Sequence, residues 1–155
     1  MIMYGGGWCY DRKGKYNKLD IYSELIRKGV FFTDYTKKTS KKVTRLLTKA
    51  KTGDIIYLKS YDIHRQTLII QAIGYFINDE LIEETIGGQK GIARRVNWVK
   101  ELSTPISFEI PSARRYNTTF YEENRVENIL EIINCLYGEN RIETILEIMN
   151  CLNEK

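Results

Sequence analysis

Two short apolar blocks in the middle of the chain constrain the fold more than any other feature of the sequence. They read KTGDIIYLKSY (51–61) and TLIIQAIGYF (67–76), and both are rich in β-branched and aromatic residues. The turn signal SYDIHRQ lies between them, which is typical of an antiparallel hairpin. We therefore expect strands over 54–60 and 68–77 at the centre of a small antiparallel barrel with a mouth, and such a mouth can hold a ligand.

The flanking segments alternate between helix and strand signals. Asp20 is expected to cap a short amphipathic helix that Gly29 ends, and Ser40 to cap a second, basic helix. Segment 78–91 is expected to be a loop with at most one helical turn. Val96 and Trp98 share one face of a strand by alternation, and we expect Trp98 to lie in the core. Further strands are expected over 29–35, 92–99 and 105–110.

Composition places the chain among globular proteins and excludes several kinds of site. Its 155 residues fit one domain with a real core, and 43% are hydrophobic and 28% charged. One histidine and three cysteines without metal-ligand spacing argue against zinc. No secretory signal and no apolar run of about 20 residues is evident, so we expect a cytoplasmic protein without a membrane span. The net charge of +4 favours a polyanionic or phosphate-bearing partner.

The most basic part of the chain is the second helix. Val43, Leu46 and Leu47 would face inward, while the opposite face carries Lys41, Lys42 and Arg45. Two interpretations stay open: a solvated helix face, or a surface that contacts phosphate.

The C-terminal part contains an internal repeat. ENRVENILEIINCL (123–136) recurs as ENRIETILEIMNCL (139–152), with 11 of 14 positions identical. Each copy is amphipathic, and Tyr137-Gly138 either breaks them into a hairpin or lies within one long helix. We expect a barrel domain over 1–122 and a duplicated helical segment over 123–155. Both copies pack on the barrel, or the second forms a homodimer contact.

The order of the short motifs resembles a known superfamily. KGVFFTDY, GDIIYLKSY, IIQAIGYF and RRVNWVKE follow one another as in the EVE and YTH-like branch of PUA-like proteins, over roughly residues 4–122. The resemblance implies an α+β fold: a small mixed β-barrel with surrounding helices, here followed by a C-terminal helical pair. Members of this branch bind nucleic acid, and several hold a modified base in an aromatic cage at one end of the barrel.

Position by position, the resemblance implies a ligand pocket and a phosphate-binding surface. The pocket would contain aromatic residues and polar readers of a base edge: Trp8, Tyr10, Phe31, Phe32, Thr33, Asp34, Ser60 and Tyr61. Phosphate would be held by the basic helix and a loop near the end of the barrel: Lys41, Lys42, Arg45, Arg114, Arg115 and Tyr116. Cages in relatives are often rich in tryptophan, whereas this chain has only Trp8 and Trp98.

These patterns favour binding over catalysis. The leading hypothesis is a module that captures a modified or unpaired base of DNA or RNA in the aromatic pocket. The alternatives are a binder or sequestering protein for a free nucleotide or nucleotide-derived signal, and an interaction protein that dimerises through residues 123–155. The sole histidine, His64, lies in a turn beside Asp62 and lacks a second base, and GGG at 5–7 is no phosphate-binding loop, so we expect neither an enzyme nor a cofactor.

Overall fold

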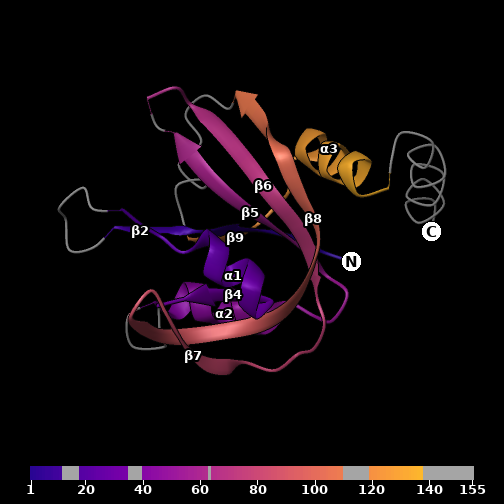
Figure 1. The fold of residues 1–155 in the computed structure, drawn as a ribbon. Helices are drawn as coiled ribbons and strands as arrows, with labels where there is room; N and C mark the ends of the chain where they lie inside the picture. Colours follow the sequence, from indigo (N-terminus) through magenta and orange to yellow (C-terminus); the bar gives the residue numbers. More distant parts are fainter. Residues whose placement is uncertain (12–17, 35–39, 63, 110–118, 138–155) are drawn as a thin grey trace. The chain divides into compact units, whose positions relative to one another are not determined.

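The computed structural model describes residues 1–155 except 12–17, 35–39, 63, 110–118 and 138–155 (Figure 1). The chain divides into two compact units, Met1–Glu122 and Glu123–Lys155. The first unit is α+β, and the described part of the second is one helix, α3 (Val126–Tyr137). Among the described residues, no helix is long and apolar enough to cross a membrane.

A curled, mixed sheet dominates the first unit. Its strands are β1 (Met3–Gly7), β4 (Val30–Thr33), β5 (Ile55–Asp62), β6 (Thr67–Phe76), β7 (Ile82–Ile86), β8 (Gln89–Glu109) and β9 (Phe120–Glu122). The order is β4-β8-β6-β5-β1-β9, with β7 also paired to β8. The β1–β5 pair is parallel and the other pairs are antiparallel. A small separate ribbon joins β2 (Cys9–Asp11) to β3 (Lys18–Asp20), and the helices are α1 (Tyr22–Lys28) and α2 (Lys41–Lys49).

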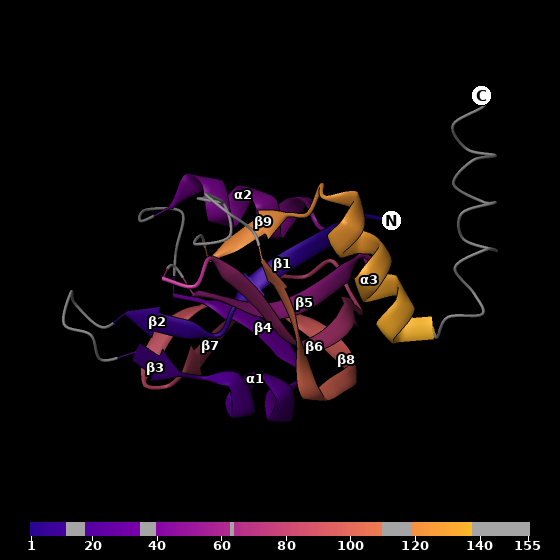
Figure 2. The ribbon, with the colours of Figure 1, turned by 90° about the horizontal axis from the view of Figure 1, so that it is seen from above.

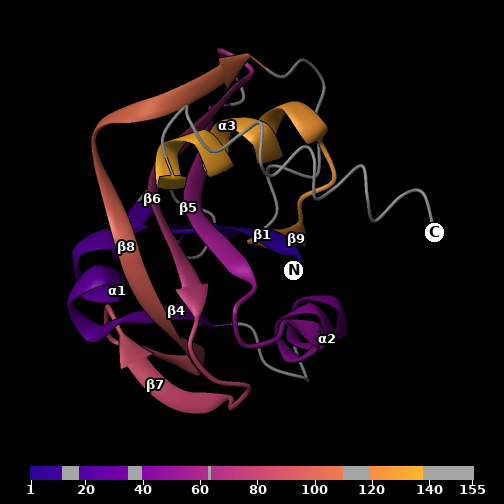
Figure 3. The ribbon, with the colours of Figure 1, turned by 90° about the vertical axis from the view of Figure 1, so that its right-hand side faces the viewer.

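Strand β8 gives the sheet its curl. Its first residues pair with β4 and β7, and the rest, from Val96 onward, pairs with β6 through two register shifts. Figures 1 and 3 show it leaving the β7 hairpin and sweeping around the unit. The two strands expected over 92–99 and 105–110 are therefore one continuous strand. The intervening Ser103, Thr104 and Pro105 do not end it because they lie at an exposed part of β8.

The expectation of a loop over 78–91 is wrong. Strand β7 and the start of β8 form a hairpin there, and Gly87 and Gly88 both adopt positive φ at its turn. Two consecutive glycines are the signal of such a turn, and Ile82, Glu84 and Ile86 before them share the more buried face of β7. The polar composition of the segment hid this signal.

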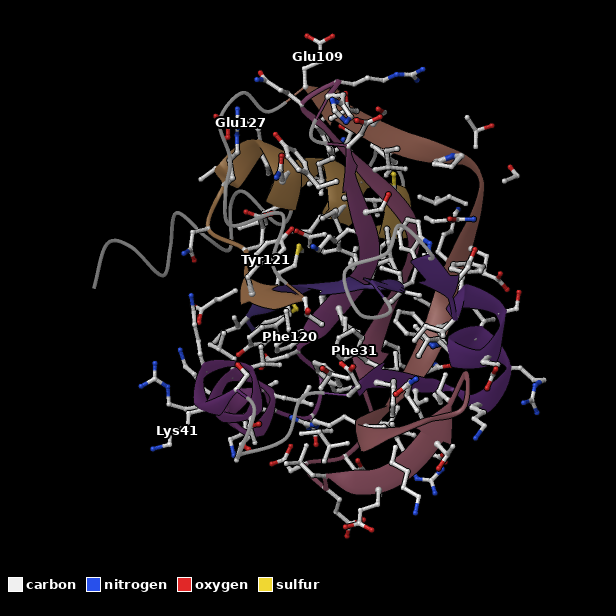
Figure 4. The ribbon with its side chains drawn as sticks, turned by 90° about the vertical axis from the view of Figure 1, so that its left-hand side faces the viewer. Phe31, Lys41, Glu109, Phe120, Tyr121 and Glu127 are labelled. Atoms are coloured by element: carbon white, nitrogen blue, oxygen red, sulfur yellow. The ribbon has the colours of Figure 1, made fainter. Side chains whose placement is uncertain are left out.

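The sheet is a half-barrel rather than a closed one. Among the described residues no ladder joins its terminal strands, β4 and β9. Their side chains meet instead: the rings of Phe31 and Phe120 stack with centroids 5.1 Å apart (Figure 4). Phe31 also lies directly on the backbone of Gly6, where a Cβ atom would collide with its ring. Aromatic packing over a glycine thus closes the curl.

Gly5 plays the matching role on the other face of β1. The ring of Tyr121, which pairs with Gly5 across the β1–β9 ladder, occupies the space of a Cβ atom at Gly5. Figure 4 shows Tyr121 and Phe120 on opposite sides of β9. A Cβ atom at Gly7, in contrast, would find its nearest neighbour 3.6 Å away. The glycine run is therefore explained at positions 5 and 6 and not at position 7.

The two early helices are anchored by side chains of the sheet. Ile21 is the N-cap of α1, one residue later than expected, although the Asp20 carboxylate does accept a hydrogen bond from the N–H of Tyr22 (2.9 Å). Gly29 ends α1 in the left-handed conformation, and Ser40 accepts a hydrogen bond from the Val43 N–H, as expected. Trp98 packs against the core and donates its indole N–H to the carbonyl of Leu25 (3.1 Å).

Arg94 has the largest fully buried side chain among the described residues. Its guanidinium donates to the carbonyls of Leu47 (3.0 Å) and Ala50 at the end of α2, and to that of Asn78. It also lies 4.5 Å from the centre of the Phe76 ring. The last carbonyls of a helix lack hydrogen-bond donors within the helix. Arg94 provides these donors and so fixes α2 to the sheet.

The helix α3 is amphipathic, with Ile133 among its buried residues. Val126 is 57% exposed, whereas Asn128 and Ile132 are buried. Asn128 donates a hydrogen bond to Glu123 (3.0 Å), whose carboxylate also accepts the N–H groups of Asn124 and Arg125. A polar residue can thus belong to the buried side when a local carboxylate pairs with it. The second copy of the repeat lies outside the described residues.

We predict different effects of alanine along the glycine run. Gly5→Ala and Gly6→Ala should each lower the free energy of unfolding by about 1–3 kcal/mol, because a ring must shift to admit the methyl group. Gly7→Ala should leave stability nearly unchanged, since the described residues leave room for its Cβ atom. Urea unfolding of the three variants is the measurement, and equal losses at all three positions would contradict the explanation.

Candidate ligand-binding site

The inner face of the sheet changes from apolar to polar beyond Leu58. Side chains alternate along each strand, so Ser60 and Asp62 of β5 lie on the same face as the core residue Leu58. The ladders extend this face into two cross-strand rows: Ser60–Ile69–Ser107 and Asp62–Thr67–Glu109. We call these six residues the arm face. Apart from Ile69 they are polar, and none is fully buried.

Trp8 lies where the apolar core meets the arm face. It follows Gly7, which pairs with Lys59, and alternation places it on the same side as Tyr4 and Gly6. Its ring is only 7% exposed and meets that of Tyr22 edge to face, with centroids 6.0 Å apart. Its carbonyl accepts the N–H of Ile21 (3.1 Å), so the backbone at Trp8 is fixed as well.

The indole N–H groups of the two tryptophans are used differently. That of Trp98 donates to Leu25, whereas that of Trp8 forms no hydrogen bond to any residue that the structure describes. Indole N–H groups usually find a partner when the ring is buried. The Trp8 indole N–H is thus a hydrogen-bond donor that no described residue uses.

Tyr22 connects Trp8 to a carboxylate. Its hydroxyl donates to Glu101 (3.0 Å), which pairs with Ala72 and so lies on the inner face. Burial, and then this hydrogen bond, raise the pKa of Tyr22 to about 12. The phenol thus stays protonated at physiological pH and holds the carboxylate in place.

The other residues of the expected pocket are placed less favourably for a ligand. Phe31, Phe32 and Thr33 have no exposed surface. Asp34 follows them at the end of β4, and burial raises the pKa of its carboxyl. Tyr61 points to the outer face, two residues after Lys59. The side chain of Tyr10 lies outside the described residues.

The structure therefore brings together Trp8 and Ser60 on one face, and leaves Tyr61 on the other. Figure 2 shows β1 and β4 both running toward the side of the β2–β3 ribbon. Sequence reasoning missed Tyr22 and Glu101, the residues that accompany Trp8. Tyr22 lies in the short helix expected after Asp20, and nothing in that local pattern indicates its contacts with Trp8 and Glu101.

The cations of α2 are unevenly paired. Lys49 forms an ion pair with Glu122 (2.9 Å), and Lys51, just after the helix, pairs with Asp79 (3.6 Å). Lys41, Lys42 and Arg45 are exposed, and no ion pair joins them to another described residue. The start of a helix carries a partial positive charge, so lysines there oppose stability and favour a bound anion. Figures 1 and 2 place this start on the side toward which β1 runs.

The expected basic loop lies outside the described residues. Arg114, Arg115 and Tyr116 belong to it, and its described neighbours in the chain are Glu109 and Thr119. The carbonyl of Thr119 accepts the N–H of Gly7 (2.8 Å). Thr119, at the end of the loop, thus lies beside Gly7, which precedes Trp8.

A second polar cluster occupies the outer face. Tyr57 and Tyr121 meet hydroxyl to hydroxyl across Gly5 at 2.5 Å, and the Nζ atom of Lys59 lies 5.4 Å from the centre of the Tyr121 ring. Burial lowers the pKa of Lys59 to about 7. Alternation along β5 could have identified this cluster, since it places Tyr57 and Lys59 on the same face.

The Asp62 carboxylate caps the turn that holds His64. Asp62 accepts hydrogen bonds from the N–H groups of His64 (2.9 Å) and Arg65 (3.1 Å), and these bonds lower the pKa of its carboxyl. His64 itself is exposed. No group of three acidic, cysteine or histidine residues within the described parts of the chain could hold a metal ion.

Comparison with protein-family models and with curated proteins finds no match to this chain.

We predict that Lys59 makes stability depend on pH. Because folding lowers its pKa, the unfolded chain holds this proton more tightly, and the free energy of unfolding should rise as pH increases from about 7 toward the ordinary lysine value. Lys59→Met should remove this rise, because a methionine side chain binds no proton. Urea unfolding across this pH range tests it, with the exposed Lys90→Met as control. A rise of the same size in Lys59→Met would assign it to another group.

Proposed function

We propose that this protein is a nucleic-acid-binding module that captures a modified or unpaired base beside Trp8. In this proposal the curled α+β unit is a PUA-like domain of the EVE and YTH-like kind. The base would enter over the arm face, and the sugar–phosphate backbone would follow the start of α2.

The indole N–H of Trp8, which donates to no described residue, carries the proposal. The Trp8 ring contacts that of Tyr22, whose hydroxyl donates to Glu101, and alternation places Trp8 on the same face as Ser60. A base offers a flat apolar face and a polar edge, so it suits a surface with both aromatic and hydrogen-bonding groups. Only a small part of the Trp8 ring is exposed, so its contribution would be an edge contact, with stacking left to Tyr22.

The distribution of charge supports the same division of roles. Figure 4 shows Lys41 and Glu109 at opposite ends of the first unit. The arm face contains carboxylates and hydroxyls but no lysine or arginine. Repulsion by these carboxylates disfavours a phosphate group there. Lys41, Lys42 and Arg45 offer the positive charge that a nucleic-acid backbone requires.

We predict that the two tryptophans respond differently to phenylalanine. Trp8→Phe keeps the ring against Tyr22 and removes the N–H, so base-dependent binding should fall about tenfold or more with little change in stability. Trp98→Phe should instead cost about 1 kcal/mol of stability, from the lost bond to Leu25, and leave binding intact.

Fluorescence anisotropy with short DNA and RNA, with and without methylated bases, and thermal unfolding are the two measurements. Unchanged binding by Trp8→Phe would refute base capture at this position. Tight uptake of free nucleotides with weak polymer binding would move the protein to the sequestering class.

We also predict that α2 sets the dependence of binding on salt. Lys42→Gln and Arg45→Gln should each lower the slope of log affinity against log salt concentration by about 1. Lys49→Gln is the matched control, because Glu122 already neutralises that lysine. An equal change in all three variants would point to net charge rather than to a defined backbone contact.

A further inference from the structure

Acidic residues lie on the inner face of the sheet, and one of them is linked to Trp8 through Tyr22. Glu101 lies next to Tyr22, and Asp62 and Glu109 form the ends of one row of the arm face. Among the described residues, the one cation within ion-pair distance of these acids is Arg65, whose side chain is 85% exposed and lies 3.8 Å from Asp62. Glu101, which Tyr22 links to Trp8, forms no ion pair with another described residue.

Glu101 is the acid best placed to select a ligand. The hydroxyl of Tyr22 fixes one of its oxygens at 3.0 Å, and the ring of Tyr22 lies 6.0 Å from that of Trp8, centre to centre. An aromatic ring and a fixed carboxylate together attract a flat cation, through the ring quadrupole and through charge-assisted hydrogen bonds. A neutral base gains neither the ion pair nor the cation–π attraction, and its acceptor edge would face carboxylate oxygens.

Trp8 supplies the complementary contact. Trp8 is only 7% exposed, and its N–H has no partner among the described residues. A donor in this position requires an acceptor on the ligand. A simple ammonium group has none, whereas a cationic nitrogen heterocycle keeps ring nitrogens or a carbonyl that can accept.

We propose that the ligand of this site is a positively charged, N-alkylated nucleobase, bound between the Trp8 donor and the Glu101 carboxylate. This inference rests on the proposed function and narrows it from modified bases in general to those that carry charge. The stabilisation comes from the charge itself, so an isomer of the same size without charge should be a poor ligand.

The test compares two isomers that differ in charge. Near neutral pH, 1-methyladenosine is a cation and N6-methyladenosine is neutral, and both would be measured as free nucleosides and within one oligonucleotide sequence. The wild-type protein should bind the cationic isomer at least about tenfold more tightly. Glu101→Gln, which keeps an acceptor for Tyr22, should remove this preference, while Glu83→Gln on β7 should retain it.

The outcomes separate the two proposals. Equal affinities, tighter binding of the neutral isomer, or a preference that survives Glu101→Gln would overturn the charge selection. If binding in those cases still depends on Trp8, base capture stands. Failure of both isomers to bind in either context would overturn both proposals.

Discussion

The contact of Phe31 with Gly6 and Phe120 is the constraint on which the first unit depends. The sheet has two terminal strands, β4 and β9, that share no ladder among the described residues, yet its core must be enclosed. A glycine in β1 lets the Phe31 ring lie against the backbone and reach Phe120. Burying such a ring contributes about 2–3 kcal/mol, and an aromatic pair adds about 1 kcal/mol. The curl, and with it the place of Trp8 at the end of β1, follows from this closure.

Arg94 performs a comparable task for α2. A helix packed against a sheet by three apolar residues could rotate or slide, but the guanidinium ties its last carbonyls to the chain after β6. The cost of burying this charge is offset by the carbonyl acceptors and by the face of Phe76. The same bond that completes the core therefore also fixes where Lys41, Lys42 and Arg45 meet solvent.

The sequence predicted the elements better than their connections. Local signals sufficed for the central hairpin, the Ser40 cap and the Gly29 end, because each depends on residues close in the chain. The sequence did not predict that β8 is one continuous strand or that β7 forms a hairpin with it. The polar residues in both segments are typical of loops and obscured the alternation of a strand. Arg94 lies two residues before Val96, so alternation places it on the inward face. Its charge alone favours solvent, and only the carbonyls of α2, which are distant in the sequence, explain its burial. The pairing of Tyr22 with Glu101 joins distant segments, and nothing local indicates it.

The position of β1 has a consequence for synthesis of the chain. This first strand lies between β5 and β9, and Tyr4 pairs with Glu122 at the far end of the unit. On the ribosome, the strand that will occupy the middle of the sheet must wait for the last segment before both its edges are covered. Until then Phe31 and Tyr4 lack the ring of Phe120, and an apolar strand edge is open to other chains. The unit thus acquires its structure late and nearly all at once, so the nascent chain is most vulnerable to aggregation just before residue 122 emerges.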